Sequence, residues 1–154
     1  KGPMASVDYH MVRDYQKTGK VQLFEGSGGV ASGEQTRDFV SVVDAVNLNL
    51  WFLENQDKSG IFNCGTGQAR SFNDLAVATV NTCRAAEGLS PLSLNQICQQ
   101  GILEYIKFPE GLLEKYQNFT EADTRKLLEI GYGNPFLSLE EGVEKYVQWL
   151  LDSN

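Results

Sequence analysis

The chain has 154 residues, of which 42% are hydrophobic and 21% charged, a composition typical of one globular domain able to bury a core. Its net charge of −7 and its lack of any basic run exclude general nucleic-acid binding. No apolar run approaches the length of a membrane span and no signal peptide opens the chain, so we expect a cytoplasmic protein with no membrane partner. Three widely spaced cysteines and one histidine predict neither a metal site nor a disulfide framework.

The first predicted elements are a helix and a strand. Apolar residues recur at helical spacing over residues 4–15 and predict a helix of about four turns, which Gly19 ends. Alternation over residues 21–24 predicts a strand, after which residues 25–27 begin a turn. A glycine-rich loop then leads to Arg37, just before the next apolar run.

Arg37 is the first candidate binding residue. An arginine where a loop meets a rigid element can bind a phosphate or carboxylate through paired N–H donors. The residues alone also allow a loop ion pair with Glu25, Glu34 or Asp38, and composition favours that reading because surface ion pairs are common.

The middle of the chain predicts a helix and a second strand. The run that follows Asp44 is apolar on nearly every side, which predicts a buried helix packed between layers. Residues 61–64 predict a strand that the turn at residues 65–67 stops. Residues 87–101 form a connector with one helical turn of its own, and residues 102–108 predict a third strand.

Three capping boxes predict further helix starts, since each places a hydroxyl three residues before a carboxylate. The three pairs are Ser71–Asp74, Thr120–Asp123 and Ser138–Glu141. The first helix should run through Ala85, the second should end at Gly131, and the last carries a strong apolar face. Strands alternating with helices predict a mixed α/β fold, but three short strands make a thin sheet, so we expect this piece to pack against something else.

Two glycine motifs follow predicted strands without forming a dinucleotide fingerprint. The first, at residues 26–31, precedes a polar, glycine-broken segment where the fingerprint needs a helix N-terminus. In the second, at residues 65–67, Arg70 stands where a third small residue should be. Cys64 is interpreted as a small packed residue rather than a nucleophile, because the single histidine is distant in sequence.

Several runs together carry a family resemblance. They are Lys1-Gly2-x-Met4-Ala5-Ser6, Leu23-Phe24-Glu25-Gly26-Ser27, Arg37-Asp38-Phe39-Val40, Asn49-Leu50-Trp51-Phe52-Leu53-Glu54-Asn55, Gly60-Ile61-Phe62-Asn63-x-Gly65-Thr66-Gly67 and Tyr116-Gln117. Along essentially the whole chain they resemble the ADP-L-glycero-D-manno-heptose 6-epimerases of the extended short-chain dehydrogenase/reductase superfamily.

The resemblance implies that residues 1–154 are a C-terminal substrate-binding domain, a small mixed α/β lobe lacking most of the Rossmann domain. In the family, an N-terminal Rossmann domain binds NADP and supplies a catalytic tyrosine, so we expect this fragment to be inactive alone. The implied activity inverts C6″ of ADP-heptose by oxidation and re-reduction, for lipopolysaccharide precursor synthesis, in a full-length protein expected to be a homo-oligomer. A sibling nucleotide-sugar dehydratase or reductase, or a non-catalytic nucleotide-binding module, stays open.

The resemblance also implies site residues. Lys1 matches the family's second acid/base group, and the implied substrate contacts are His10, Phe24, Glu25, Gly26, Ser27, Arg37 and Tyr116. Together they predict one cradle of cations and amide donors for the diphosphate, which reverses the preference for an ion pair at Arg37. No cofactor-binding residue is implied within the chain. Three features depart from the family pattern: Pro3 at a common serine position, a longer loop at residues 28–36, and an insertion at residues 87–101.

Overall fold

The computed structural model describes residues 5–153, apart from the side chain of Lys115, and has a mixed α/β fold. The helices are α1 (Val7–Thr18), α2 (Val42–Glu54), α3 (Phe72–Ala86), α4 (Leu94–Gln99), α5 (Arg125–Glu129) and α6 (Leu139–Asp152), with a 3-10 turn η1 (Leu113–Lys115). The strands are β1 (Val21–Phe24), β2 (Thr36–Arg37), β3 (Arg70–Ser71) and β4 (Leu103–Ile106). Within this described range, no helix combines the length and apolar character that crossing a bilayer requires.

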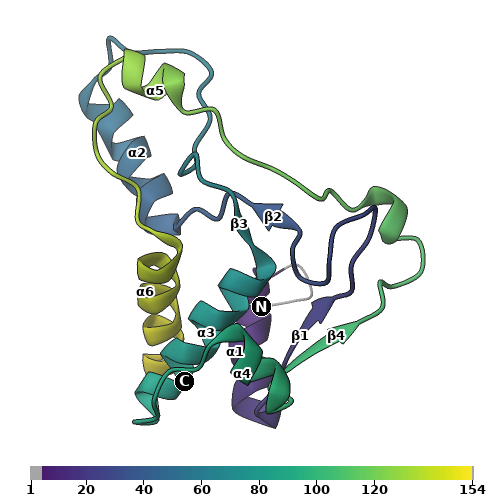
Figure 1. Cartoon of the computed structure of the whole chain (residues 1–154). Coiled ribbons are helices and arrows are strands. Elements are labelled where there is room, and N and C mark those ends of the chain that lie inside the picture. Colours follow the sequence, from purple (N-terminus) through teal and green to yellow (C-terminus); the bar gives the residue numbers. More distant parts are fainter. Residues whose placement is uncertain (1–4, 154) are drawn as a thin grey trace.

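The main core lies among α1, α3 and α6, beside a parallel ribbon of β1 and β4 (Figure 1). Val12, Val80 and Val147 are fully buried there, one from each of the three helices. In the ribbon, Val21 pairs with Leu103, which brings the predicted first and third strands side by side. Burying these apolar surfaces is the principal stabilising contribution to this part of the fold.

Most local predictions for this core are confirmed. Gly19 closes α1 in the left-handed conformation (φ 70°), and its N–H donates to the Tyr15 carbonyl at 2.8 Å. The predicted first strand has the predicted bounds. The capping boxes at Ser71 and Ser138 both form and open α3 and α6.

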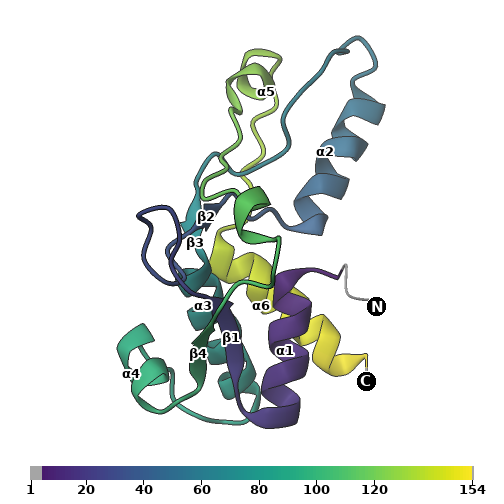
Figure 2. The same ribbon diagram turned by 90° about the vertical axis from the view of Figure 1, so that its right-hand side faces the viewer.

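A second, smaller core joins α2 to α5 at the other end of the molecule from α4 (Figures 1 and 2). Leu48 of α2 packs with Leu127 and Tyr132, and the rings of Trp51 and Tyr132 meet edge to face at 5.4 Å. Only Asp44 and Leu48 of α2 are buried, so the prediction of a helix packed between layers is wrong for the described chain. The helix packs on one side only.

Two other predictions are wrong. Residues 61–64 form no strand, because no neighbouring strand within the described range pairs with them. The expected helix start at Thr120 is shifted to α5, which begins after Thr124. The backbone at Phe119 bridges to Thr36, and the Thr120 N–H donates to the Thr36 carbonyl at 3.3 Å, so this segment is extended where a helix should begin.

Candidate functional site

A two-stranded antiparallel ribbon, β2 with β3, positions Arg37. Thr36 pairs with Ser71, and Arg37 lies opposite Arg70. Two arginines facing each other across a ribbon repel unless each has partners. The Arg70 guanidinium is neutralised by Asp74, at 3.0 Å from Nε, and by a second carboxylate from α6. Arg37 therefore remains the cation of the ribbon that is available to a ligand.

The Arg37 guanidinium is held by backbone carbonyls and aromatic rings. Its Nη1 donates to the Thr36 carbonyl at 2.7 Å, and its Nη2 donates to the Gln117 carbonyl. Its Cζ lies 5.1 Å from the centroid of the Tyr116 ring and 5.6 Å from that of Phe72. A guanidinium has five N–H donors, so these contacts fix the group while leaving N–H groups for an anion.

The structure does not show the alternative considered for Arg37, an ion pair with a nearby carboxylate of the loop. Among the described residues no carboxylate lies within ion-pair distance of Arg37, so Glu25, Glu34 and Asp38 are not its partners. The Asp38 carboxylate is instead bonded to backbone N–H groups and a threonine. A positive group without a carboxylate partner is typical of an anion-binding site.

His10, Phe24 and Tyr116 line one cavity of about 160 Å³ beside the β1 strand. The rings of Phe24 and Tyr116 meet edge to face with centroids 5.8 Å apart. Burial raises the pKa of the Tyr116 hydroxyl, and the nearby charge of Arg37 only partly opposes this. The hydroxyl therefore stays protonated at neutral pH and can donate a hydrogen bond.

Arg37 lines a neighbouring cavity of about 370 Å³, with Ser6, Val40 and Ser138 among its other walls. Val7 and Phe72 border both cavities, so the two adjoin, although His10 lines only the first and Arg37 only the second. The expected single cradle is thus divided between adjoining cavities in this structure.

The turn after β1 lies next to the first of these cavities, because Glu25 directly follows Phe24. Glu25 and Gly26 line a third cavity, of about 610 Å³, together with Phe108, whose ring stacks on Phe24 at 4.5 Å. The Ser27 hydroxyl donates to the Asn118 side chain at 3.3 Å. Six of the eight implied site residues therefore line one of three cavities. Lys1, like Pro3, lies outside the described residues.

Gln35 and Asn73 hold the loop between β1 and β2, and sequence reasoning missed both. Gln35 is 2% exposed, and its Nε2 donates to the Glu25 carbonyl at 3.0 Å. Asn73, at the start of α3, donates from Nδ2 to the Ser32 carbonyl at 3.1 Å and accepts a hydrogen bond from the Tyr105 hydroxyl. These buried amides fix the turn and Arg37 relative to the core despite the length of the loop.

Replacing Gly33 with alanine should test this anchoring. Gly33 has φ +71°, and a Cβ there would lie 2.1 Å from Oδ1 of Asn73, so the new methyl group must displace the Asn73 amide. We expect Gly33→Ala to lower the free energy of unfolding by about 2 kcal/mol more than Gly88→Ala does. Gly88 is the matched control because its φ of +73° is similar but nothing lies within 4 Å. Equal losses in chemical denaturation of the two variants would contradict the anchoring role.

The Asp38 carboxylate joins its own segment of the chain to the turn at residues 66–67 and to Ala122. Its Oδ1 accepts hydrogen bonds from the Thr66 N–H at 2.8 Å and from the Thr66 hydroxyl at 2.6 Å. Its Oδ2 accepts from the N–H groups of Gly67, at 2.9 Å, and Ala122, at 3.0 Å. A Cβ at Gly65 would lie 2.6 Å from this carboxylate, which explains the small residue there. The Arg37-Asp38 pair thus combines a cation that no described carboxylate neutralises with a structural anchor.

The hydrogen bonds that Asp38 accepts from Thr66 and Gly67 also show whether this glycine turn could bind a cofactor. The amides of Thr66 and Gly67 already hold an anion, the Asp38 carboxylate, so this turn does not fit a cofactor pyrophosphate. A Cβ at Gly26 would lie 2.3 Å from the Val30 carbonyl, so the other glycine loop is closed on itself. Cys64 is exposed, so the prediction that it is packed is wrong. Partial desolvation and the nearby charges of Asp44 and Asp38 raise the pKa of its thiol, which disfavours a reactive thiolate.

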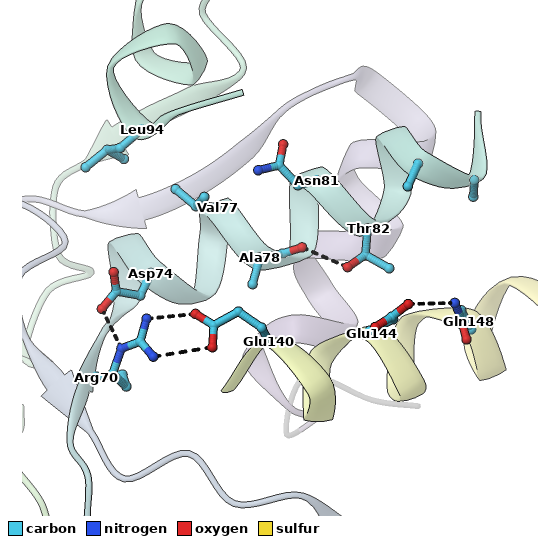
Figure 3. A pocket seen from close by; sticks show the side chains of 12 residues that line it. Arg70, Asp74, Val77, Ala78, Asn81, Thr82, Leu94, Glu140, Glu144 and Gln148 are labelled. Atoms are coloured by element: carbon cyan, nitrogen blue, oxygen red, sulfur yellow. Dashed lines mark hydrogen bonds and ion pairs between the residues drawn. The ribbon is translucent and has the colours of Figure 1, made fainter. Parts of the chain in front are cut away.

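A larger cavity, of about 680 Å³, lies between α3 and α6 (Figure 3). There Arg70 donates to Asp74 and, at 2.8 Å, to Glu140, and this bonding to Arg70 lowers the pKa of Glu140. None of the implied substrate residues lines this cavity, and its arginine is engaged by two carboxylates. We therefore assign no ligand to it.

Comparison with solved structures places the fold in a class. The chain matches UDP-N-acetylglucosamine 4-epimerase from Methanobrevibacter ruminantium, solved with UDP-N-acetylmuramic acid, at a TM-score of 0.69 and 19% identity. It matches dTDP-glucose 4,6-dehydratase from Bacillus anthracis, solved with NAD, at a TM-score of 0.70 and 16% identity. Each match covers 100% of this chain and 42% of the other. The fold is thus the mixed α/β lobe seen in extended short-chain dehydrogenase/reductase enzymes that modify nucleotide sugars.

Sequence comparison gives a narrower relationship. Residues 3–65 match the model of the NAD dependent epimerase/dehydratase family. Over 153 residues the chain is 54% identical to the ADP-L-glycero-D-manno-heptose-6-epimerase of Thiobacillus denitrificans. The match covers 99% of this chain and 46% of that protein. The chain is related to these epimerases, which confirms the resemblance drawn from its residues, and it spans about half the length of that relative.

Proposed function

We propose that this chain is the substrate-binding domain of an ADP-L-glycero-D-manno-heptose 6-epimerase that works in the cytoplasm on the heptose precursor of lipopolysaccharide. The observation that carries the proposal is the 54% identity to such an epimerase over nearly the whole chain. The Arg37 guanidinium lies beside Tyr116 and has no carboxylate partner among the described residues, which is consistent with a diphosphate ligand. The full-length protein is proposed to be a homo-oligomer.

The side chains of this domain would bind and orient the nucleotide sugar. The free N–H groups of Arg37 and the ring of His10 would donate to the diphosphate. The Tyr116 hydroxyl, kept protonated by burial, would donate to a phosphate or sugar oxygen. The backbone amides of the turn at residues 25–27 would add neutral donors to the same anion.

The remaining chemistry is assigned to a second lobe. The glycine turns of this chain do not fit a dinucleotide, so we propose that NADP binds outside residues 1–154. When bound there, NADP would supply the hydride acceptor and donor that oxidation and re-reduction of the substrate require. Lys1 is proposed as one of two acid/base groups, because inversion presents the reacting oxygen from two directions.

The proposal is tested by measuring C6″ inversion of ADP-heptose in the presence of NADP. The full-length protein from the gene that encodes this chain is expected to invert ADP-heptose and not to turn over UDP- or dTDP-sugars. The 154-residue chain alone is expected to be inactive, because it lacks the hydride carrier. Turnover of a UDP- or dTDP-sugar in place of ADP-heptose would assign the protein to a sibling dehydratase or reductase, and turnover by the 154-residue chain would refute the division of roles.

A further inference from the structure

The first turn of α3 holds the loop that precedes Arg37. The N–H of Phe72 donates to the Gln35 carbonyl at 3.1 Å, and the N–H of Asn73 donates to the Gly33 carbonyl at 2.9 Å. The first N–H groups of a helix have no acceptor within the helix, so these two loop carbonyls satisfy two of them. The position of the loop therefore depends on this turn of α3.

The side chain of Asn73 adds two further bonds to the same loop. Its NH₂ group donates to the Ser32 carbonyl at 3.1 Å and to a carboxylate oxygen of Glu34 at 2.5 Å. Its Oδ1 accepts a hydrogen bond from the Tyr105 hydroxyl at 2.8 Å. Asn73 is 4% exposed, so both ends of its amide depend on these protein partners rather than on water.

The Tyr105 hydroxyl supports one orientation of the Asn73 amide. An asparagine amide can turn by half a circle, which exchanges the positions of its oxygen and its NH₂ group. In the turned orientation the amide oxygen would face the oxygens of Ser32 and Glu34, which have no proton to offer. Without the hydroxyl, the observed orientation would leave Oδ1 buried and without a donor, which is costly. The hydroxyl therefore stabilises the arrangement in which the NH₂ group binds the loop.

The surroundings of Tyr105 keep its hydroxyl a hydrogen-bond donor. Tyr105 lies on β4 beside Cys98 of α4, a helix within residues 87–101. Burial and the neighbouring Cys98 thiol raise the pKa of Tyr105 to about 12, so the hydroxyl keeps its proton at neutral pH. Helix α4 is itself fixed in the main core by Ile97, which is fully buried. This part of the chain thus holds Tyr105 in place on the side away from the loop.

We propose that Tyr105 is a positioning residue for nucleotide-sugar binding, which acts through Asn73 on the loop before Arg37. Tyr105 lines none of the three cavities that contain the implied substrate residues, so its hydroxyl acts through Asn73 and not by contact with the ligand. The loop reaches the site at two points. The Gln35 side chain donates to the Glu25 carbonyl at 3.0 Å, and the chain continues directly into β2 and its arginine.

Tyr105→Phe removes the hydroxyl and keeps the ring. In the full-length protein, we expect this variant to bind ADP-heptose about fivefold more weakly in isothermal titration calorimetry, and to raise KM by a similar factor with kcat unchanged. Tyr15→Phe is the matched control, because Tyr15 lies in the same core and its hydroxyl bonds to Arg84 rather than to the loop. It should change neither the affinity nor KM. Equal losses of affinity in the two variants would overturn the proposal.

A double-mutant cycle tests the route through Asn73. Asn73→Ala alone should weaken the binding of ADP-heptose at least as much as Tyr105→Phe does, because it removes both side-chain bonds to the loop. If the hydroxyl acts through Asn73, adding Tyr105→Phe to Asn73→Ala should change the affinity by less than about twofold. A further loss of about fivefold in the double variant would mean that Tyr105 acts by another route, and it would refute the proposal.

Hydrogen exchange measures the hold on the loop without any ligand, and the inference rests on the proposed function only for the identity of that ligand. In the full-length Tyr105→Phe variant, we expect the amides of Gly33 and Asn73 to exchange about 10-fold faster than in the unaltered protein, and those of α6 to be unchanged. Faster exchange in a protein that does not bind ADP-heptose would support the hold of Tyr105 on the loop and contradict only the proposed ligand. Unchanged exchange at Gly33 and Asn73 would overturn the positioning role.

Discussion

An Arg37→Lys variant of the full-length protein is expected to bind ADP-heptose about 100-fold more weakly than the unaltered protein. The guanidinium already donates to the carbonyls of Thr36 and Gln117, and its remaining N–H groups have no partner in the described part of the chain, so they can bind an anion. A lysine ammonium has three donors on a flexible stem, so it cannot keep both carbonyl bonds and also grip a phosphate with a planar fork. It also loses the planar contact with the Tyr116 ring.

Arg70→Lys supplies the matched control for this experiment. Arg70 lies directly opposite Arg37 in the same ribbon, but Asp74 and Glu140 already bind its guanidinium. Isothermal titration calorimetry should therefore show little change in affinity for Arg70→Lys. If Arg37→Lys binds within threefold of the unaltered protein, or if both variants weaken equally, Arg37 is not the diphosphate ligand.

Elements with local signals were predictable from the sequence. The capping box at Ser71 depends on a residue only three positions away, and the closure of α1 depends on Gly19 alone. The strand at residues 21–24 was predictable from its alternation, and its partner β4 was predicted as a strand without its register. The ribbon of β2 and β3 has two residues in each strand, too few to show any periodicity.

Elements that depend on a distant partner were predicted less well. Apolar residues around α2 indicated burial, but a count of apolar residues does not say whether a covering layer lies in the same polypeptide. Residues 61–64 have the composition of a strand, yet a strand forms only beside another. Thr120 had a helix-start signal that was overridden by its pairing with Thr36, far away in sequence.

The residues of the candidate site were likewise predictable only where the sequence carried a local signal. Arg37 could be selected as a candidate because it lies where a loop meets a rigid element. The other substrate-contact residues came from the family resemblance. Gln35, Asp38 and Asn73, which hold the site in place, bond mainly to residues whose sequence spacing has no recognisable pattern. Their roles follow from burial and geometry, which only the folded chain provides.

Replacing Asp38 with asparagine in the 154-residue chain is expected to lower the free energy of unfolding by about 3 kcal/mol at pH 7. Each carboxylate oxygen accepts two hydrogen bonds, Oδ1 from Thr66 and Oδ2 from Gly67 and Ala122. An asparagine has one oxygen and one NH₂ group. Whichever way the amide turns, its NH₂ faces two donors, so two partly buried N–H or O–H groups lose their acceptor.

Measuring the loss of unfolding free energy at several pH values distinguishes an effect of the charge of Asp38 from an effect of its shape. Burial alone would raise the pKa of Asp38, but the bonds from Thr66, Ala122 and Gly67 outweigh it and hold the pKa below its ordinary value. The carboxylate therefore stabilises the fold fully above its unfolded pKa of about 4 and loses that effect as the pH falls through its lower, folded pKa. Urea unfolding should give a constant difference in unfolding free energy between Asp38→Asn and the unaltered chain from pH 7 to about 5, shrinking below about 4.

The control is Asp57→Asn, at a carboxylate that is 73% exposed, which should lower the free energy of unfolding by less than about 0.5 kcal/mol throughout. A difference at Asp38 that persists unchanged at acid pH would mean that its shape, and not its charge, joins the three segments.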